Sequence, residues 1–291
     1  MADGEAREIG IASPAGVRLA VCQTGPPRGA AVVLLHGLTM TREYVLMGSD
    51  ELERNGFRVI AYDARAHGRS TAPSDPEDYG YDSLGADLLA VLDALDVGRA
   101  VLVGGSMGCH TALRVALDHP ERVSGIVAIT PAFDPDRHPN EDDLRVADHL
   151  AAAIRSGGAE GYVAALQDIG DPAMSMSLPA LTLRRLAQHR DLCAVADATQ
   201  ANLRRAPFDS FGDLAPIQTP TLVVGSRDKL DPRHPHDLAR AYADAIPGAA
   251  FEIEPEGRAP IAWNGRKLAR LVLRLALTTN DRSTKLPVQG S

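Results

Sequence analysis

The sequence is poor in the residues that mark several classes of protein. Only three of its 291 residues are cysteines, at positions 22, 109 and 193. Their odd number and wide spacing argue against a disulfide framework and against a cysteine-ligated metal site. Lysine occurs only at positions 229, 267 and 285, and the formal net charge is -8. This acidic balance argues against a general affinity for nucleic acid or for an anionic membrane.

Long apolar runs are also lacking. The first residues of the chain show no basic stretch followed by an apolar one. No run approaches the roughly 20 apolar residues that a membrane-spanning helix needs. We therefore expect a cytoplasmic protein whose partners include neither membrane nor nucleic acid.

The apolar residues that are present make up 45% of the chain, which is enough for a sizeable core. Continuous apolar runs predict buried strands, and they alternate with runs of helical spacing. The expected strands are 8–12, 17–23, 30–35, 57–62, 101–105, 123–130, 219–225 and 250–254. The expected helices around them are 43–55, 81–95, 109–118, 236–246 and 265–277. This order predicts an α/β fold with a mostly parallel sheet that helices cover on both faces.

Residues 131–215 interrupt this alternation. They contain no good strand, only amphipathic stretches at 142–156, 159–167 and 178–205. We therefore predict a single core formed by residues 1–130 and 216–277, with 131–215 inserted as a helical lid. The polar residues 278–291 are expected to form a disordered tail.

One stretch carries chemistry. The apolar run Val101–Val103 leads into Gly104-Gly105-Ser106-Met107-Gly108 and then directly into a helical pattern. A Gly-x-Ser-x-Gly sequence between a strand and a helix forms a sharp turn that lifts the serine hydroxyl above the end of the sheet. Ser106 is therefore the candidate nucleophile.

With this stretch, four motifs resemble those of α/β-hydrolases, and they occur in the family's order. They are His36-Gly37, the run from Asp63 to Ser70, the turn around Ser106, and Gly225-Ser226-Arg227-Asp228. The resemblance is strongest to enol-lactonases and small-ester hydrolases. It implies the α/β-hydrolase fold, a mostly parallel eight-stranded sheet flanked by helices, with a lid inserted after the sixth strand.

The resemblance also implies roles for particular residues. The backbone N–H groups of Leu38 and Met107 would form the oxyanion hole, and Asp228 would be the acid of a catalytic triad. Gly37 would line the substrate pocket. Met174 and Met176 in the lid are candidates to line it as well, because methionine suits an adaptable apolar surface.

The sequence departs from the family at the third member of the triad. Where the family has a histidine after the last strand, this chain has Arg258, and no histidine occurs beyond His236. A guanidinium stays protonated at any working pH, so it cannot serve as the general base for Ser106.

Three interpretations of Arg258 follow. In the preferred one, Arg258 pairs with Asp228 and holds negative charge on a small apolar substrate. Ser106 is then a hydrogen-bond donor, and the reaction is a cyclisation, elimination or decarboxylation in specialised metabolism. In the second, the protein hydrolyses esters or lactones with a replacement base, for which the candidates are His138, His149, His189, His234 and His236. In the third, the protein binds a small molecule without converting it.

None of these interpretations requires a cofactor or a metal, and the oligomeric state stays open. The remaining histidines near the motifs, His36, His67 and His110, are expected to be structural. Asp134 is a second candidate for the acid.

Overall fold

The computed structural model describes residues 6–137, 139–170 and 178–284, with side chains described as far as residue 280. Eight strands form one sheet in the order β1-β2-β4-β3-β5-β6-β7-β8. They are β1 (Arg7–Ala12), β2 (Arg18–Thr24), β3 (Ala31–Leu35), β4 (Arg58–Tyr62), β5 (Ala100–Gly105), β6 (Val123–Ile129), β7 (Thr221–Val224) and β8 (Ala250–Glu252). Strand β2 pairs antiparallel with β1 and β4, and all other neighbours are parallel. The expected eight-stranded, mostly parallel sheet is confirmed.

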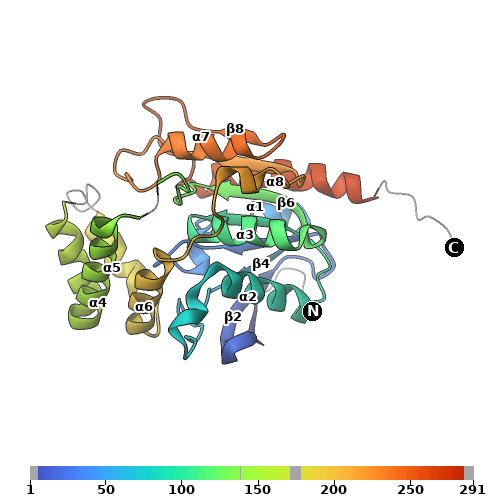
Figure 1. Cartoon of the computed structure of the whole chain (residues 1–291). Coiled ribbons are helices and arrows are strands. Elements are labelled where there is room, and N and C mark those ends of the chain that lie inside the picture. The colour runs from blue at the N-terminus through green and yellow to red at the C-terminus, as the bar shows by residue number, and fades with distance from the viewer. Residues whose placement is uncertain (1–5, 138, 171–177, 285–291) are drawn as a thin grey trace.

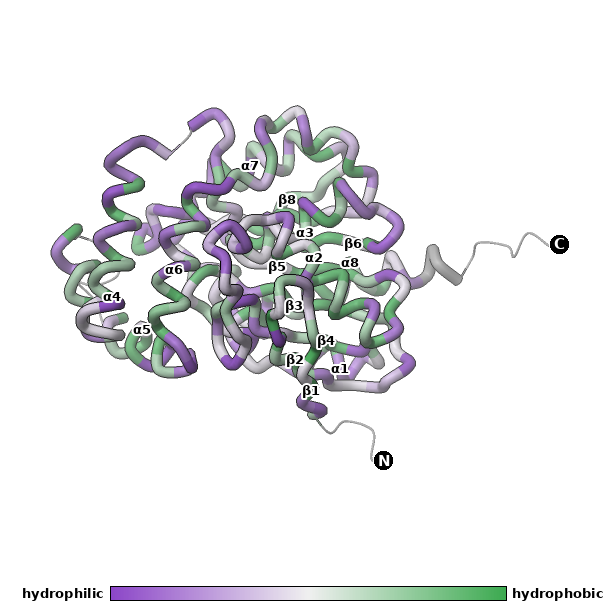
Figure 2. The backbone as a smooth tube through the Cα atoms, turned by 60° about the horizontal axis from the view of Figure 1, so that its bottom comes forward, coloured by the Kyte–Doolittle hydropathy of each residue, from purple (hydrophilic) through white to green (hydrophobic). Residues whose placement is uncertain are grey.

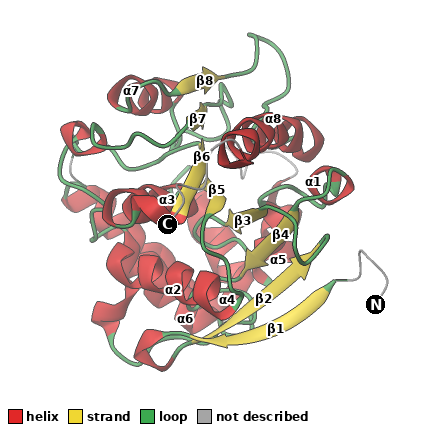
Figure 3. Ribbon diagram, turned by 90° about the vertical axis from the view of Figure 1, so that its right-hand side faces the viewer, coloured by secondary structure: helices red, strands yellow, loops and turns green. Residues whose placement is uncertain are grey.

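Helices cover both faces of this sheet (Figure 3). Helices α2 (Tyr81–Ala94), α3 (Met107–Asp118) and α7 (His236–Ala245) contribute to one apolar core cluster. Helices α1 (Glu51–Arg54) and α8 (Gly265–Thr284) contribute to a second cluster. Residues of β3 alternate between the two clusters, Val33 and Leu35 in the first and Val32 and Leu34 in the second. This explains why the strand is apolar throughout instead of in alternate positions.

Between β6 and β7 the chain forms α4 (Glu141–Asp168), α5 (Leu178–Leu186) and α6 (Leu192–Asn202). Figure 1 shows these three helices together at one side of the sheet. They share an apolar cluster of their own, which includes Leu150, Ile154 and Leu186. In Figure 2 hydrophilic and hydrophobic stretches alternate along them, as expected of helices with one buried face. That this insertion works as a lid stays a prediction.

Two expected helices are divided. The helix predicted over 43–55 is reduced to α1 and the single turn Arg42–Tyr44. Met47 and Gly48, at φ 50° and 75°, adopt left-handed backbone that ends a helix. The helix predicted over 178–205 is likewise two helices, because residues 187–191 form a turn that carries His189.

The predicted disordered tail is wrong for residues 278–284, which continue α8. No glycine or proline occurs between Arg266 and Thr284 to end that helix. Thr279 is buried and lies against Gly125 of β6, so this turn of the helix still packs on the sheet. Residues 285–291 lie outside the described part of the chain.

Candidate active site

Ser106 lies in the sharp turn that the sequence predicts between β5 and α3. Its backbone has φ 49° and ψ -114°, a conformation that residues with side chains rarely adopt. The turn is possible because two glycines clear the space around it. A Cβ on Gly104 would lie 2.2 Å from the Gly108 carbonyl oxygen, and one on Gly108 would lie 2.2 Å from the carbonyl oxygen of Leu35. The turn therefore projects the Ser106 hydroxyl at the carboxyl end of the sheet.

A histidine is within hydrogen-bond distance of that hydroxyl. Ser106 Oγ lies 3.0 Å from His234 Nε2, and His234 Nδ1 lies 2.7 Å from Asp231 Oδ1. The side chains of His234 and Asp231 are mostly buried, at 16% and 18% exposure. In this geometry the serine hydroxyl donates to Nε2, and the Nδ1–H group donates to the carboxylate. His234 thus contacts both a serine hydroxyl and a carboxylate, which is the arrangement that nucleophilic catalysis by a serine requires.

The loop between β7 and α7 brings His234 and Asp231 together. The Asp231 N–H donates to the Asp228 carbonyl at 3.1 Å, and the His234 N–H donates to the Asp231 carbonyl at 3.3 Å. Asp228 itself turns its carboxylate to the backbone, where Oδ1 accepts from the Leu230 N–H at 3.0 Å. Asp228 therefore braces the loop, and the carboxylate that meets the histidine belongs to Asp231.

The premise that no histidine reaches Ser106 is wrong. Arg258, which was expected in the pocket, is exposed on a turn after β8, where its N–H donates to the Pro255 carbonyl at 3.1 Å. Arg258 does not line the cavity at Ser106, and among the described residues it makes no ion pair with Asp228. Arg258 lies outside the cavity because the turn that carries it faces solvent.

From the sequence a histidine was expected after β8, where the chain has Arg258, whereas the histidine that contacts Ser106 follows β7. His234 stood among the five candidate replacements, but Asp231 was not considered. A signal was present in Asp231-Pro232-Arg233-His234-Pro235, directly after the strand that should carry the acid. An aspartate and a histidine three residues apart, with prolines restricting the backbone, can meet within one turn.

The three other candidate bases that the structure describes, His149, His189 and His236, make no hydrogen bond to Ser106. His149 is exposed on α4, and His236 pairs with Asp237 at the start of α7. His189 is buried between Gly68 and Thr39. His138 lies outside the described residues.

The expected oxyanion-hole residues, Leu38 and Met107, both line the cavity with Gly37 and Ser106. The Met107 N–H is the first of α3 and has no acceptor within the helix. The Leu38 N–H has no acceptor among the described residues either. Two backbone donors are thus available beside the serine hydroxyl.

The cavity itself has a volume of about 500 Å³. Apolar and aromatic side chains from the core and from the insertion form much of its wall, among them Leu150, Phe133 and Trp263. The two methionines expected to line it, Met174 and Met176, lie outside the described residues. Asp134 lies on the wall without contacting His234 in the described structure.

His110, on the wall of this cavity, is neutral and structural. Its Nε2 accepts the N–H groups of Ala132 and Phe133, both at 3.3 Å. Burial, together with the nearby His234, lowers the pKa of His110 to about 3. His110 therefore supports the chain after β6 and supplies no base.

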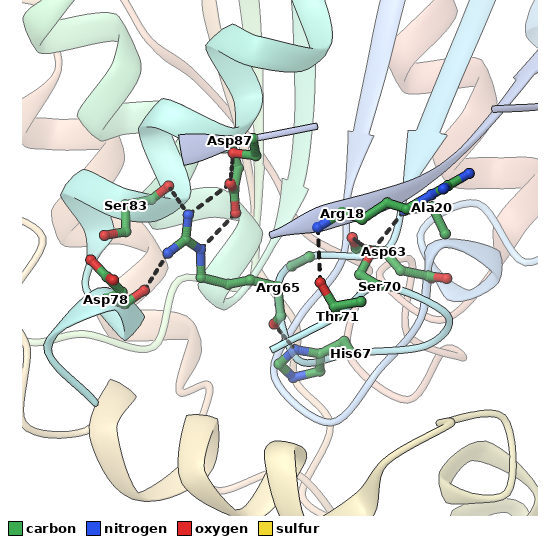
Figure 4. Close-up of polar contacts among 12 residues, drawn as sticks. Arg18, Ala20, Asp63, Arg65, His67, Ser70, Thr71, Asp78, Ser83 and Asp87 are labelled. Carbon is green, nitrogen blue, oxygen red and sulfur yellow. Dashed lines mark hydrogen bonds and ion pairs between the residues drawn. The ribbon is translucent and has the colours of Figure 1, made fainter. Parts of the chain in front are cut away.

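Hydrogen bonds and one ion pair stabilise the turn from Asp63 to Ser70, and Figure 4 shows the ion pair between Arg65 and Asp87. Asp63 accepts from the N–H groups of Arg42 and Arg69, each at 3.0 Å. Arg65 forms a buried ion pair with Asp87, with Nε 2.7 Å from Oδ2. These residues hold the turn beside the site without entering it.

The described part of the chain contains no group of three or more histidine, cysteine, aspartate or glutamate side chains placed to hold a metal ion. Of the described helices, none is both long and apolar enough to span a bilayer.

Comparison with known proteins gives a consistent result. A family model described as the alpha/beta hydrolase fold matches residues 30–265. The chain is 31% identical over 238 residues to a protein of Variovorax paradoxus provisionally named as the carbamate hydrolase RutD, covering 80% of this chain and 86% of that one. It is 32% identical over 239 residues to a non-heme chloroperoxidase of Streptomyces lividans, covering 78% and 81%.

Solved structures agree on the fold. A thermophilic esterase from Thermogutta terrifontis superposes with a TM-score of 0.75 at 21% identity, covering 94% of this chain and 99% of that one. The enol-lactonase of Burkholderia xenovorans LB400 superposes with a TM-score of 0.69 at 22% identity, covering 95% and 100%.

Proposed function

Since this chain belongs to the alpha/beta hydrolase fold family and is an enzyme of that superfamily, we propose that it is a serine hydrolase of small esters or lactones. The observation that carries the proposal is the contact of Ser106 Oγ with His234 Nε2 at 3.0 Å, with Asp231 on the other ring nitrogen. The names of the relatives, which include hydrolases, support the same class of reaction. The non-hydrolytic alternative loses its main support because its starting point was a serine without a base.

In the first half of the reaction, Ser106 Oγ attacks the ester carbonyl carbon while His234 Nε2 takes the hydroxyl proton. Asp231 holds the Nδ1–H group and stabilises the imidazolium that forms. The carbonyl oxygen becomes negative and is met by the N–H groups of Met107 and Leu38, whose loss typically lowers kcat about 10²- to 10³-fold per donor.

In the second half, the tetrahedral intermediate collapses and the bond to the leaving oxygen breaks. His234 returns the proton to that oxygen, which leaves as an alcohol, and the acyl group stays on Ser106. Water then gives a proton to His234 as it attacks the acyl carbon. Release of the acid returns the proton to Ser106 Oγ.

The cavity supports a small, largely apolar substrate. A volume of about 500 Å³ is within the usual range for a small-molecule site, and aromatic side chains contribute to its wall. Triad chemistry needs no cofactor, so we propose none. A cytoplasmic location and a role in specialised metabolism stay predictions.

The test is replacement of His234 by Ala, with His236→Ala as the matched control two residues away. We expect the kcat/KM for p-nitrophenyl butyrate to fall about 10⁴-fold in His234→Ala and to stay unchanged in the control. A fluorophosphonate probe should label wild-type protein on Ser106, as seen by peptide mass, and should leave Ser106→Ala unlabelled.

Normal turnover by His234→Ala would refute the assignment of the base, and normal turnover by Ser106→Ala would refute serine catalysis altogether. A wild-type protein that binds p-nitrophenyl esters without turnover or labelling would instead indicate a binding protein.

A further inference from the structure

We propose that His189, from the helical insertion, is a positioning residue for the oxyanion hole, acting through Thr39 together with His67. This inference rests on the proposed serine-hydrolase function. The three residues come from separate parts of the chain. Thr39 follows β3, His67 follows β4, and His189 lies in the turn between α5 and α6.

Thr39 is in a backbone conformation that its residue type disfavours. It has φ 59°, in the left-handed region, although it is β-branched and buried. It is the third residue of a turn that the Met40 N–H closes on the Gly37 carbonyl at 3.1 Å. Turns with positive φ at this place normally have glycine there. Leu38, which lines the cavity and whose N–H has no acceptor among the described residues, is the second residue of the same turn, so the direction of that N–H depends on the conformation of the turn.

Two histidines hold Thr39 on both sides. The Thr39 N–H donates to His67 Nε2 at 3.2 Å, and the Thr39 carbonyl oxygen lies 3.2 Å from His189 Nε2. Each ring is fixed in turn by its other nitrogen. His67 Nδ1 lies 2.9 Å from the Arg65 carbonyl, and His189 Nδ1 accepts the Gly68 N–H at 2.8 Å.

These contacts determine the protonation of His189. Nδ1 accepts a hydrogen bond, so the single proton of a neutral ring is on Nε2, where it is donated to Thr39. Burial is the main cause that lowers the pKa of His189 to about 4. His36 and Arg185 act in the same direction, and the Thr39 carbonyl and Asp63 act against it. The neutral ring with this tautomer is therefore the form present at neutral pH.

The contacts extend into a cluster formed by His36, His67 and His189. The ring centroids of His36 and His67 are 5.1 Å apart, and those of His67 and His189 are 5.6 Å apart. The Arg190 N–H also donates to the Gly68 carbonyl at 2.9 Å, which joins the insertion to the core beside the cluster. The helical insertion is thus bonded directly to the turn that presents the Leu38 N–H.

The test compares His189→Leu with His149→Leu, an exposed histidine of the same insertion that serves as control. With p-nitrophenyl butyrate, we expect kcat of His189→Leu to fall about 10- to 100-fold, approaching the loss of one oxyanion donor, while KM changes less than about threefold. Affinity for a trifluoromethyl ketone, whose adduct with Ser106 is an oxyanion, should weaken by the same factor. His189→Gln can still donate and accept, and should retain most activity.

A rescue separates positioning from a merely structural role. Glycine adopts positive φ without support, so Thr39→Gly added to His189→Leu should restore much of kcat. If His189→Leu does not fold, His189→Asn replaces it, because its side chain is too short to reach both Gly68 and Thr39.

Unchanged kcat and ketone affinity in the folded variant would overturn the proposal, as would a loss confined to KM or a loss that Thr39→Gly does not rescue. These outcomes leave the proposed function intact as long as Ser106→Ala is inactive. Activity in Ser106→Ala would instead refute the function on which the proposal rests.

Discussion

The loops that follow β7 and β8 differ in what they bring to the same cavity. The loop after β7 carries His234, which contacts Ser106, and Asp231, which contacts His234. The loop after β8 carries Trp263, which lines the cavity wall, and the exposed Arg258. The two loops are joined by Glu254, a buried carboxylate that accepts N–H groups from Arg227 and Ile261.

The comparison indicates that a catalytic role depends on where a side chain lies in the fold, so that either of the two loops could supply it. Parallel strands end at the same edge of a sheet, so neighbouring strand ends offer alternative positions from which a side chain can reach one point. In the proposed mechanism the loop after β7 supplies the acid and the base, while the loop after β8 supplies part of the cavity wall. Arg258 therefore need not replace the chemistry of the histidine expected at its position.

The largest effect should separate the two carboxylates of the loop after β7. Asp231→Asn should lower kcat/KM about 10⁴-fold, because the amide no longer stabilises the imidazolium of His234 or its tautomer. Asp228→Asn should lower it less than about fivefold, because the amide oxygen can still accept the Leu230 N–H. Steady-state kinetics with p-nitrophenyl butyrate measures both. Equal losses in the two variants would return the role of the acid to Asp228.

The next test removes the histidine of the loop after β7 and places one in the loop after β8. A double variant, His234→Ala with Arg258→His, should stay about 10⁴-fold below wild type, because position 258 does not reach Ser106. Arg258→His alone should match wild type in turnover of the same ester. Recovery of activity in the double variant would show that the loop after β8 can still approach the serine.

The smallest effect concerns the pH dependence of stability that the buried His189 causes. The folded-state pKa of His189 is lowered from 6.5 to about 4, so the unfolded chain binds more protons between these two values. The contribution of His189 to the free energy of unfolding is therefore fully present above pH 6.5. It is lost as the pH falls towards 4, and the total loss is about 3 kcal/mol.

Urea unfolding at pH 7, 6 and 5 measures this loss. His189→Gln should reduce the pH dependence, because glutamine does not titrate. An equal pH dependence in wild type and His189→Gln would contradict the lowered pKa.

The predictions that succeeded from sequence rest on local patterns. Buried strands are continuously apolar, and the turn at Ser106 needs Gly104 and Gly108 because backbone atoms lie within 2.2 Å of where their Cβ atoms would be. The predicted helix over 43–55 failed at Met47, whose left-handed backbone has no marker in its residue type.

From the sequence, His234 could be named only as one of five candidate bases, for a different reason. The identity of the base depends on which strand end faces Ser106, and this is a property of the folded sheet. The spacing of Asp231 and His234 permitted a contact, but only the path of the loop after β7 brings that contact to the serine. The hydrogen bonds of Thr39 with His67 and His189 could not be predicted from the sequence either, because they join positions 39, 67 and 189.

Asp231 and His234 are three residues apart in one turn, and this has a consequence for how the enzyme tolerates change. Their mutual geometry is set by a short piece of backbone, so a shift of that loop carries acid and base together as one unit. Only the approach of this unit to Ser106 depends on the rest of the fold. In the proposed mechanism the segment after β8 supplies no catalytic side chain, so substitutions there should be limited by packing and by the cavity wall that Trp263 helps to form.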